Sequence, residues 1–470
     1  MEVLDQITNP YLPFWEYVPD GEPYLFDGRL YVYGSHDLFG GDVYCMGDYV
    51  CWSADPDDLG SWRYEGVIYR KSDDPENEDL QGNLYAPDVT VGPDGRYYLY
   101  YVLSNRDFVS VAVSDTPAGK YEFYGYVHYE DGARLGQREG DEPQFDPGVL
   151  TEGVETYLYT GFCPLDDKSR HGAMCTVLSS DMLTIKRDPV FVVPAKHNST
   201  GTGFEDHAYF EAASIRKKDG LYYFIYSSEA SRELCYATSI RPDGDFTYRG
   251  VLIDNGDIGI DTYKKAGMPG MYCANNHGSI ICIDGRWYIF YHRHTNGTNY
   301  SRQGCFEKLE ADGPVNFRQA ALTSCAGVPF TARGFYPAYL ACNLFTDTEG
   351  LMIPWCGWMD DRFPKITREV YNDDEPAGYI ANMRDTARAG FKYFDCKDTK
   401  VVSVKIKGYA TGKLEIRTEW DKEPLGSFPV EYSNVWRIVT GSVNIPDGIN
   451  SIWITFSGEG YLQFAGFEIA

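Results

Sequence analysis

The sequence predicts an all-β protein in which a five-bladed β-propeller is followed by a small β-sandwich. A hairpin pattern, a turn glycine followed by an alternating strand rich in aromatic residues, recurs five times in the first three quarters of the chain. Helical periodicity is nearly absent. The last hundred residues have shorter alternating strands and little net charge. At 470 residues the chain is too long for one ordinary domain, so we expect two or three.

Each copy of the hairpin pattern supplies two strands of one predicted blade. The five turn glycines are Gly28, Gly95, Gly153, Gly220 and Gly285. Asp-Gly between alternating apolar runs is a strong hairpin signal. A second pair of strands follows each hairpin, as at 50–53 and 62–66. Five units of four strands make a five-bladed propeller.

The end of the chain predicts a different domain. After about residue 365, short strands such as 401–406 and 451–456 are separated by turn residues, which is typical of a small β-sandwich. We therefore predict a propeller at residues 1–330, a connector packed between the domains at 331–365, and a sandwich at 366–470.

Composition excludes several classes of function. Lys and Arg number 42 against 69 Asp and Glu, a formal net charge of −27. Nucleic acids and anionic membranes would repel such a chain, so neither is expected as a partner. Phosphate-loop, dinucleotide and serine-hydrolase signatures are absent. The chain start does not resemble a secretory signal, and the 12 cysteines form no CxxC pair. We expect a cytoplasmic protein with buried free thiols and leave its oligomeric state open.

The first strand of each blade lines the channel of a propeller, so residues at its start converge. The positions seven to nine residues before the turn glycines carry Asp20, Asp88, Asp146, Glu211 and His277. Converging like charges are unfavourable, so this set indicates a functional site. A cation site that needs an acidic lining is the alternative interpretation.

Converging carboxylates suit the hydrolysis of glycosidic bonds. One carboxyl group must stay protonated to donate to the leaving oxygen, and another must stay ionised to activate water. A third carboxylate nearby raises the pKa of the acid by like-charge repulsion. We therefore predict a glycoside hydrolase, with a non-catalytic carbohydrate-binding propeller as the alternative.

The blade-start motifs resemble glycoside hydrolase family 43, whose members are five-bladed propellers and inverting enzymes. The opening segments 9–13 and 33–37 are similar to the first blade of that family, and the resemblance covers roughly residues 9–330. It implies an exo-acting enzyme that releases α-L-arabinofuranosyl or β-D-xylosyl units from hemicellulose fragments. An endo-acting arabinanase or xylanase stays open.

The resemblance also implies roles for individual residues. Asp20 would be the general base, Glu211 the general acid, and Asp146 the residue that raises the pKa of the acid. Glu22, in Glu22-Pro23, is a second candidate for the base, although the spacing to the turn glycine favours Asp20. Asp88 and Asp146 could exchange roles.

Further residues are expected around the substrate. The resemblance implies that Asp88 makes a substrate contact or a structural one, and that Arg302 binds substrate near the sugar site. It also implies that His277 lies beside a metal ion, usually calcium, in the channel. His36 follows a strand end and is expected either at the substrate mouth or as part of a polar loop cap.

The last segment of the chain resembles a carbohydrate-binding module of family 6. The match rests on 461–468 together with 412–436. Trp436 and Trp453 are candidates for ligand platforms, with core packing as the alternative for both.

Overall fold

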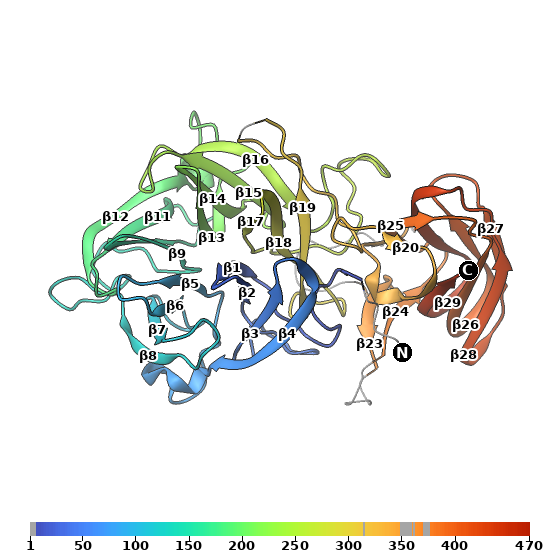
Figure 1. Cartoon of the computed structure of the whole chain (residues 1–470), viewed down its shortest axis with the longest axis horizontal. Helices are drawn as coiled ribbons and strands as arrows, with labels where there is room; N and C mark the ends of the chain where they lie inside the picture. The colour runs from blue at the N-terminus through green and yellow to red at the C-terminus, as the bar shows by residue number, and fades with distance from the viewer. Residues whose placement is uncertain (1–5, 314, 348–359, 361, 370–376) are drawn as a thin grey trace.

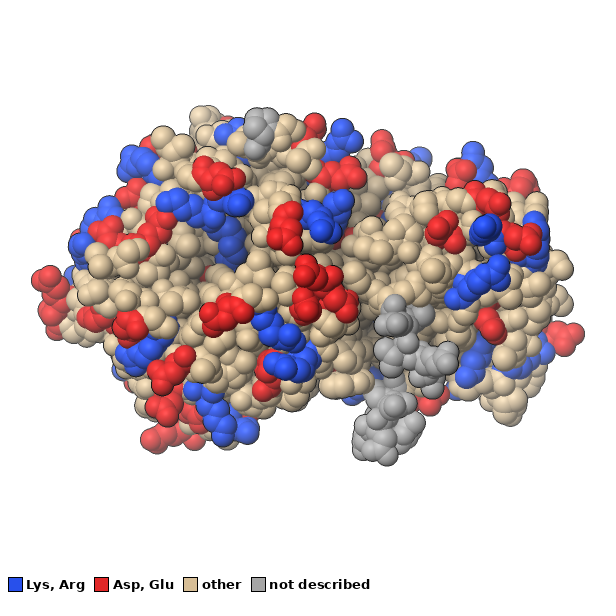
Figure 2. Space-filling view, in the orientation of Figure 1, with Lys and Arg blue, Asp and Glu red and all other residues tan. Residues whose placement is uncertain are grey.

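The protein consists of a ring of five β-sheets and a curled β-sheet beside it (Figure 1). The computed structural model describes residues 6–313, 315–347, 360, 362–369 and 377–470. Within them no helix is both long and apolar enough to cross a membrane. Figure 2 shows acidic and basic side chains interspersed on the face it presents, so the net charge of −27 is not gathered into one patch there.

Four of the blades are four-stranded antiparallel sheets with strands in chain order. Blade one contains β1 (Glu22–Phe26), β2 (Arg29–Tyr33), β3 (Tyr49–Asp55) and β4 (Asp58–Tyr69). Blade two contains β5 (Asp88–Val91), β6 (Tyr97–Tyr101), β7 (Ser110–Ser114) and β8 (Glu122–Tyr126). Blade three contains β9 (Gly148–Glu152), β10 (Glu155–Thr160), β11 (Gly172–Leu178) and β12 (Ile185–Pro194). Blade four contains β13 (Tyr209–Lys218), β14 (Leu221–Ser228), β15 (Glu233–Ser239) and β16 (Thr247–Asp254).

The predicted turn glycines lie between the first two strands of each blade, which confirms the propeller. In blade one, Asp27 and Gly28 form a two-residue loop in which φ is 49° and 77°. Two consecutive positive φ angles are the type I′ geometry that matches the twist of a β-hairpin, and glycine adopts it without steric cost.

The N-terminal segment closes the ring against blade five. That blade has three strands, β17 (Ile280–Ile283), β18 (Arg286–His294) and β19 (Arg302–Leu309). The Asn9 side chain donates to the carbonyl of Phe306 at 2.8 Å and accepts from its N–H at 3.0 Å. The N–H of Tyr11 donates to the carbonyl of Gly304. The chain start therefore lies along the outer edge of β19, as a fourth strand would.

Replacing Asn9 with Ala is expected to destabilise the propeller. The Asn9 side chain is buried and also donates to the carbonyl of Thr323 and to Glu307. Each buried polar group that loses its partner costs about 1–3 kcal/mol of unfolding free energy. Urea denaturation should therefore show a clearly lower midpoint than for Asn105→Ala, a variant at an exposed position. Equal midpoints for the two variants would contradict this account of ring closure.

The second domain is one curled sheet of ten strands. They are β20 (Phe330–Thr331), β21 (Gly334–Pro337), β22 (Asn343–Phe345), β23 (Lys365–Arg368), β24 (Gly378–Met383), β25 (Arg388–Cys396), β26 (Val401–Arg417), β27 (Gly426–Val430), β28 (Ser433–Ser442) and β29 (Gly448–Ile469). Four short 3-10 helices complete the described structure: η1 (Lys71–Asp73), η2 (Pro75–Asn77), η3 (Lys196–Asn198) and η4 (Ala338–Leu340).

The connector predicted at 331–365 begins with strands of this second sheet. β21 pairs with β29 and β22 pairs with β25. Strands of two to four residues carry too little alternation to be recognised from sequence, which is why this boundary differs from the prediction. Residues 348–359 and 361 of the predicted connector lie outside the described residues.

The two domains share one hydrophobic core. A single cluster includes Ile225 and Ile289 of blades four and five together with Phe391 and Phe464 of the second domain. Trp453 is fully buried, so it packs in the core, whereas Trp436 is half-buried beside Tyr379. The described cysteines are free and mostly buried, and Cys356 lies outside the described residues.

Candidate active site

A cavity of about 500 Å³ lies where all five blades meet. Its charged lining consists of Asp20, Asp146, Glu211, His277 and Arg302. Its aromatic lining consists of Tyr44, Tyr85, Phe145, Phe162 and Phe210. Its smaller polar lining includes Ser104, Ser231, Asn275 and Asn299. The volume is typical of a site for a small ligand, for which roughly 300–1,000 Å³ is usual.

Irregular backbone at the start of the blades directs the acidic side chains into this pocket. Asp20 and Asp146 have φ of 58° and 43°, in the left-handed region that residues other than glycine rarely adopt. Ala212 beside Glu211 has φ of 66°, and the register of β13 shifts on both sides of Glu211. Such local strain is concentrated at functional sites in proteins.

Asp20 is held as an ionised carboxylate. Nη1 of Arg302 lies 2.9 and 3.2 Å from its two oxygens, the Ser35 hydroxyl donates to Oδ2, and Nδ1 of His292 lies 3.2 Å from Oδ1. Burial would raise the pKa of Asp20, but the charge of Arg302 and the imidazole of His292 hold it well below its usual range. An ionised carboxylate of this kind can accept a proton from water.

Asp37 binds the nitrogens of the Arg302 guanidinium that do not contact Asp20. Nε and Nη2 of Arg302 donate to the two oxygens of Asp37 at 2.8 and 2.9 Å, a bidentate contact. Both side chains are buried. A planar guanidinium held in this way keeps one fixed orientation toward Asp20.

Glu211 has the opposite electrostatic environment. Burial and the negative charge of Asp146 raise the pKa of Glu211 to about 8. Burial also raises the pKa of Asp146, although His277 partly opposes this shift. A carboxyl group that is still protonated near neutral pH can act as a proton donor.

His277 lies between two acidic residues. Its Nδ1 is 3.4 Å from Asp146 and its Nε2 is 3.7 Å from Oε1 of Glu22. Burial alone would lower the pKa of His277, but Asp146 and Glu22 raise it well above the usual value. That Glu22 oxygen is buried and has no hydrogen-bond partner among the described residues. A buried carboxylate oxygen without a partner is the kind of ligand that calcium takes, so the surroundings of His277 fit the cation that the resemblance implies beside it.

The structure does not bring Asp88, His36 or Glu22 to the pocket lining. Asp88 is fully buried and accepts from the Tyr24 hydroxyl at 2.6 Å and from the N–H of Val149 at 2.7 Å, so it joins blades one, two and three. Burial and the negative charge of Glu22 raise the pKa of Asp88 to about 7. Of the two roles that the resemblance implies for Asp88, these contacts favour the structural one over the contact with substrate.

The other two residues also have partners elsewhere. His36 contacts Glu16 through Nε2 and the carbonyl of Asp48 through Nδ1, both at 2.9 Å, which is the polar loop cap considered as the alternative. Glu22 forms an ion pair with Arg216 and is not among the residues that line the pocket. Of the two candidates for the base, the pocket therefore contains Asp20 alone.

Several site residues were not predicted from the sequence. Asp20 is contacted by Ser35 and His292, while Asp37 holds the Arg302 that pairs with it. Five aromatic side chains form the walls of the pocket. Ser35 and Asp37 lie two residues apart in the segment that resembles the first blade, and this alternation places both on one side of an extended chain. His292 alternates with His294 along one strand, but without a third nearby ligand that pattern favours an ordinary strand-edge role and does not point to Asp20.

A five-bladed propeller whose central pocket holds one ionised and one protonated carboxyl group defines a glycoside hydrolase. The model of glycosyl hydrolases family 43 matches residues 30–313. A xylosidase/arabinosidase of Thermoclostridium stercorarium is 60% identical to this chain over 99% of both chains. The chain belongs to glycosyl hydrolase family 43, as the resemblance predicted.

Solved structures agree with this assignment. A family 43 enzyme of Xanthomonas citri complexed with xylose is 26% identical, covers 67% of this chain and 93% of its own, and has a TM-score of 0.53. An arabinoxylan arabinofuranohydrolase of Bacillus subtilis covers 98% of this chain and 97% of its own, with 20% identity and a TM-score of 0.51. The second of these shares its fold across both domains.

Proposed function

We propose that the protein is an inverting exo-glycosidase that releases β-D-xylosyl and α-L-arabinofuranosyl units from hemicellulose-derived oligosaccharides. The observation that carries this proposal is a single pocket that contains Asp20, ion-paired with Arg302, together with Glu211, whose pKa is raised by burial and by the charge of Asp146. The name of the 60% identical relative and the xylose bound to the Xanthomonas citri enzyme support the choice of sugars.

In the proposed reaction a water molecule attacks the anomeric carbon from the face opposite the leaving oxygen. Asp20 accepts a proton from this water while the new carbon–oxygen bond forms. Glu211 gives its proton to the leaving oxygen as the glycosidic bond breaks. Asp20 then loses its proton to solvent and Glu211 regains one, which restores the starting state. Arg302 keeps Asp20 ionised and oriented before each attack.

The pocket walls suit a sugar. Aromatic faces such as those of Tyr85 and Phe145 can pack against the apolar face of a pyranose or furanose ring. The amides of Asn275 and Asn299 can hydrogen-bond its hydroxyl groups. This combination of apolar walls with a few polar groups is usual for sites that select small polar ligands.

We propose that the calcium or similar cation lies in the channel near His277 and takes the unpartnered oxygen of Glu22 as a ligand. Such an ion would supply positive charge to the acidic channel. His277 itself contacts Asp146 and so restrains the residue that raises the pKa of Glu211.

Replacing Asp146 with Asn is expected to move the alkaline limit of activity to lower pH. The negative charge of Asp146 helps to keep Glu211 protonated, so without it the pKa of Glu211 falls. Because the protonated form donates, activity should then be lost earlier as the pH rises. The pH profile of kcat measures this shift, and an unchanged alkaline limb in Asp146→Asn would contradict the role of Asp146.

Hydrolysis of two nitrophenyl glycosides, one of xylose and one of arabinose, tests the proposed substrates. The enzyme should hydrolyse the β-D-xylopyranoside, the α-L-arabinofuranoside or both, and should remove single xylose units from xylotriose. Inactivity on both aryl glycosides combined with internal cleavage of arabinan or xylan would replace the exo-acting proposal with the endo-acting one.

A further inference from the structure

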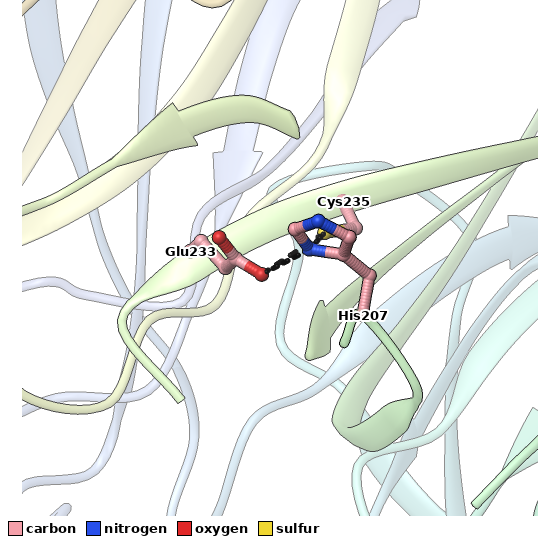
Figure 3. Close-up of side chains that lie close together, drawn as sticks. All are labelled: His207, Glu233 and Cys235. Carbon is pink, nitrogen blue, oxygen red and sulfur yellow. Dashed lines mark hydrogen bonds and ion pairs between the residues drawn. The ribbon is translucent and has the colours of Figure 1, made fainter. Parts of the chain in front are cut away.

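A cluster of three metal-binding side chains lies in blade four, outside the pocket (Figure 3). His207 belongs to the loop that leads into β13, while Glu233 and Cys235 belong to β15. Because Glu233 and Cys235 are two residues apart on a strand, their side chains lie on the same face of the sheet. Figure 3 shows the imidazole of His207 directed toward both.

The spacing of the three donor atoms is close to that of a tetrahedral metal site. Sγ of Cys235 lies 3.7 Å from Nδ1 of His207 and 3.5 Å from Oε1 of Glu233. Zinc at its usual bond lengths separates a sulfur from a nitrogen or oxygen ligand by about 3.6 Å. Nδ1 of His207 and Oε1 of Glu233 are 2.7 Å apart and would need to separate to about 3.4 Å when an ion binds between them. Their hydrogen bond would then be replaced by one bond from each atom to the ion.

The surroundings support the ligands and leave one side accessible. Glu233 and Cys235 are buried, whereas the His207 side chain is 31% exposed and so offers a route for entry. The ring of Tyr248 stacks on His207 at 4.9 Å, and the Ser228 hydroxyl donates to Glu233. Contacts of this kind orient metal ligands in proteins.

We propose that His207, Glu233 and Cys235 bind a single divalent ion of the zinc type, with water as a fourth ligand. A nitrogen, a sulfur and only one carboxylate form a donor set for borderline-soft ions, whereas calcium and magnesium require oxygen ligands. This site is therefore distinct in chemistry from the cation proposed at His277.

The ion would join two segments that lead to the pocket. His207 precedes Glu211 by four residues. Ala208, which follows His207, accepts a hydrogen bond from the N–H of Glu229 through its carbonyl. Ser231 lines the pocket two residues before Glu233. Bound metal is thus expected to raise the melting temperature of the protein, because it binds the folded arrangement of both segments.

Cobalt binding tests the site directly. Protein freed of metal by chelation is titrated with Co²⁺ alone, and a thiolate-to-cobalt charge-transfer band should rise to saturation at one ion per chain. Cys235→Ser should abolish the band, and both Cys235→Ser and His207→Gln should weaken Zn²⁺ binding measured by calorimetry at least about tenfold. Cys282→Ser, which changes a partly exposed cysteine of β17, should leave both signals intact.

The proposal would be overturned by the absence of saturable binding, by a band that persists in Cys235→Ser, or by a band that disappears in Cys282→Ser. His207→Gln changes a half-exposed side chain, so it decides the question even where Cys235→Ser fails to fold. Zn²⁺ should also raise the melting temperature of the wild type more than that of His207→Gln. Equal shifts would contradict an ion held by His207.

Discussion

Replacing Asp20 with Asn is expected to lower kcat on 4-nitrophenyl β-D-xylopyranoside by about 10²–10⁴-fold, the usual contribution of a general base. The amide retains the size of the carboxylate and can still accept from Ser35, but it cannot take a proton from the attacking water. An activated leaving group should not rescue this variant, because the base acts on water and not on the leaving oxygen.

A buried carboxylate outside the pocket provides the matched control. Asp74 is buried, accepts from the Tyr101 hydroxyl at 2.7 Å and from the N–H of Glu76 at 2.8 Å, and does not line the cavity. Asp74→Asn should keep kcat within a few fold of the wild type. If Asp20→Asn keeps full activity, or if both variants lose activity to the same degree, Asp20 is not the base.

Replacing Glu211 with Gln is expected to produce a loss that depends on the leaving group. Hydrolysis of xylotriose needs a proton on a poor leaving oxygen, so it should fall by about 10²–10⁴-fold. Nitrophenolate leaves readily without a proton, so the aryl xyloside should lose much less. Steady-state rates on the two substrates measure the difference, and an equal loss on both would contradict the role of Glu211 as the acid.

The pH profile of kcat gives a second measure of the same residue. Burial and Asp146 raise the pKa of Glu211 to about 8, so its protonated form is present below that pH and is lost as the pH rises through it. Asp20 stays ionised because its pKa is held well below the usual range, so activity should decline only in strong acid. Glu211→Gln cannot titrate, and the alkaline limb should therefore be absent from its profile.

Much of the architecture was predictable because it repeats. The hairpin glycines, such as Gly28 and Gly285, recur in a fixed relation to alternating strands, and that relation also locates the channel residues Asp20, Asp146, Glu211 and His277. A repeated fold brings equivalent positions together, so the pattern of one blade predicts the others.

The parts that were not predicted depend on contacts between distant residues. Arg302 and Asp37 are 265 residues apart in sequence, and no local pattern indicates that they form a bidentate pair. Asp88 occupies the same position in its blade as the pocket residues, yet the N–H of Val149 and the Tyr24 hydroxyl occupy its oxygens. Position in the repeat thus identifies candidates, while the neighbouring side chains determine which of them face the substrate.

Proton NMR of the anomeric region during hydrolysis shows whether Asp20 activates water or attacks the sugar. With 4-nitrophenyl β-D-xylopyranoside as substrate, α-D-xylose should appear first and the β anomer only later by mutarotation. If β-D-xylose appears first, configuration is retained, and a covalent sugar–enzyme intermediate would replace the mechanism proposed for Asp20 and Glu211.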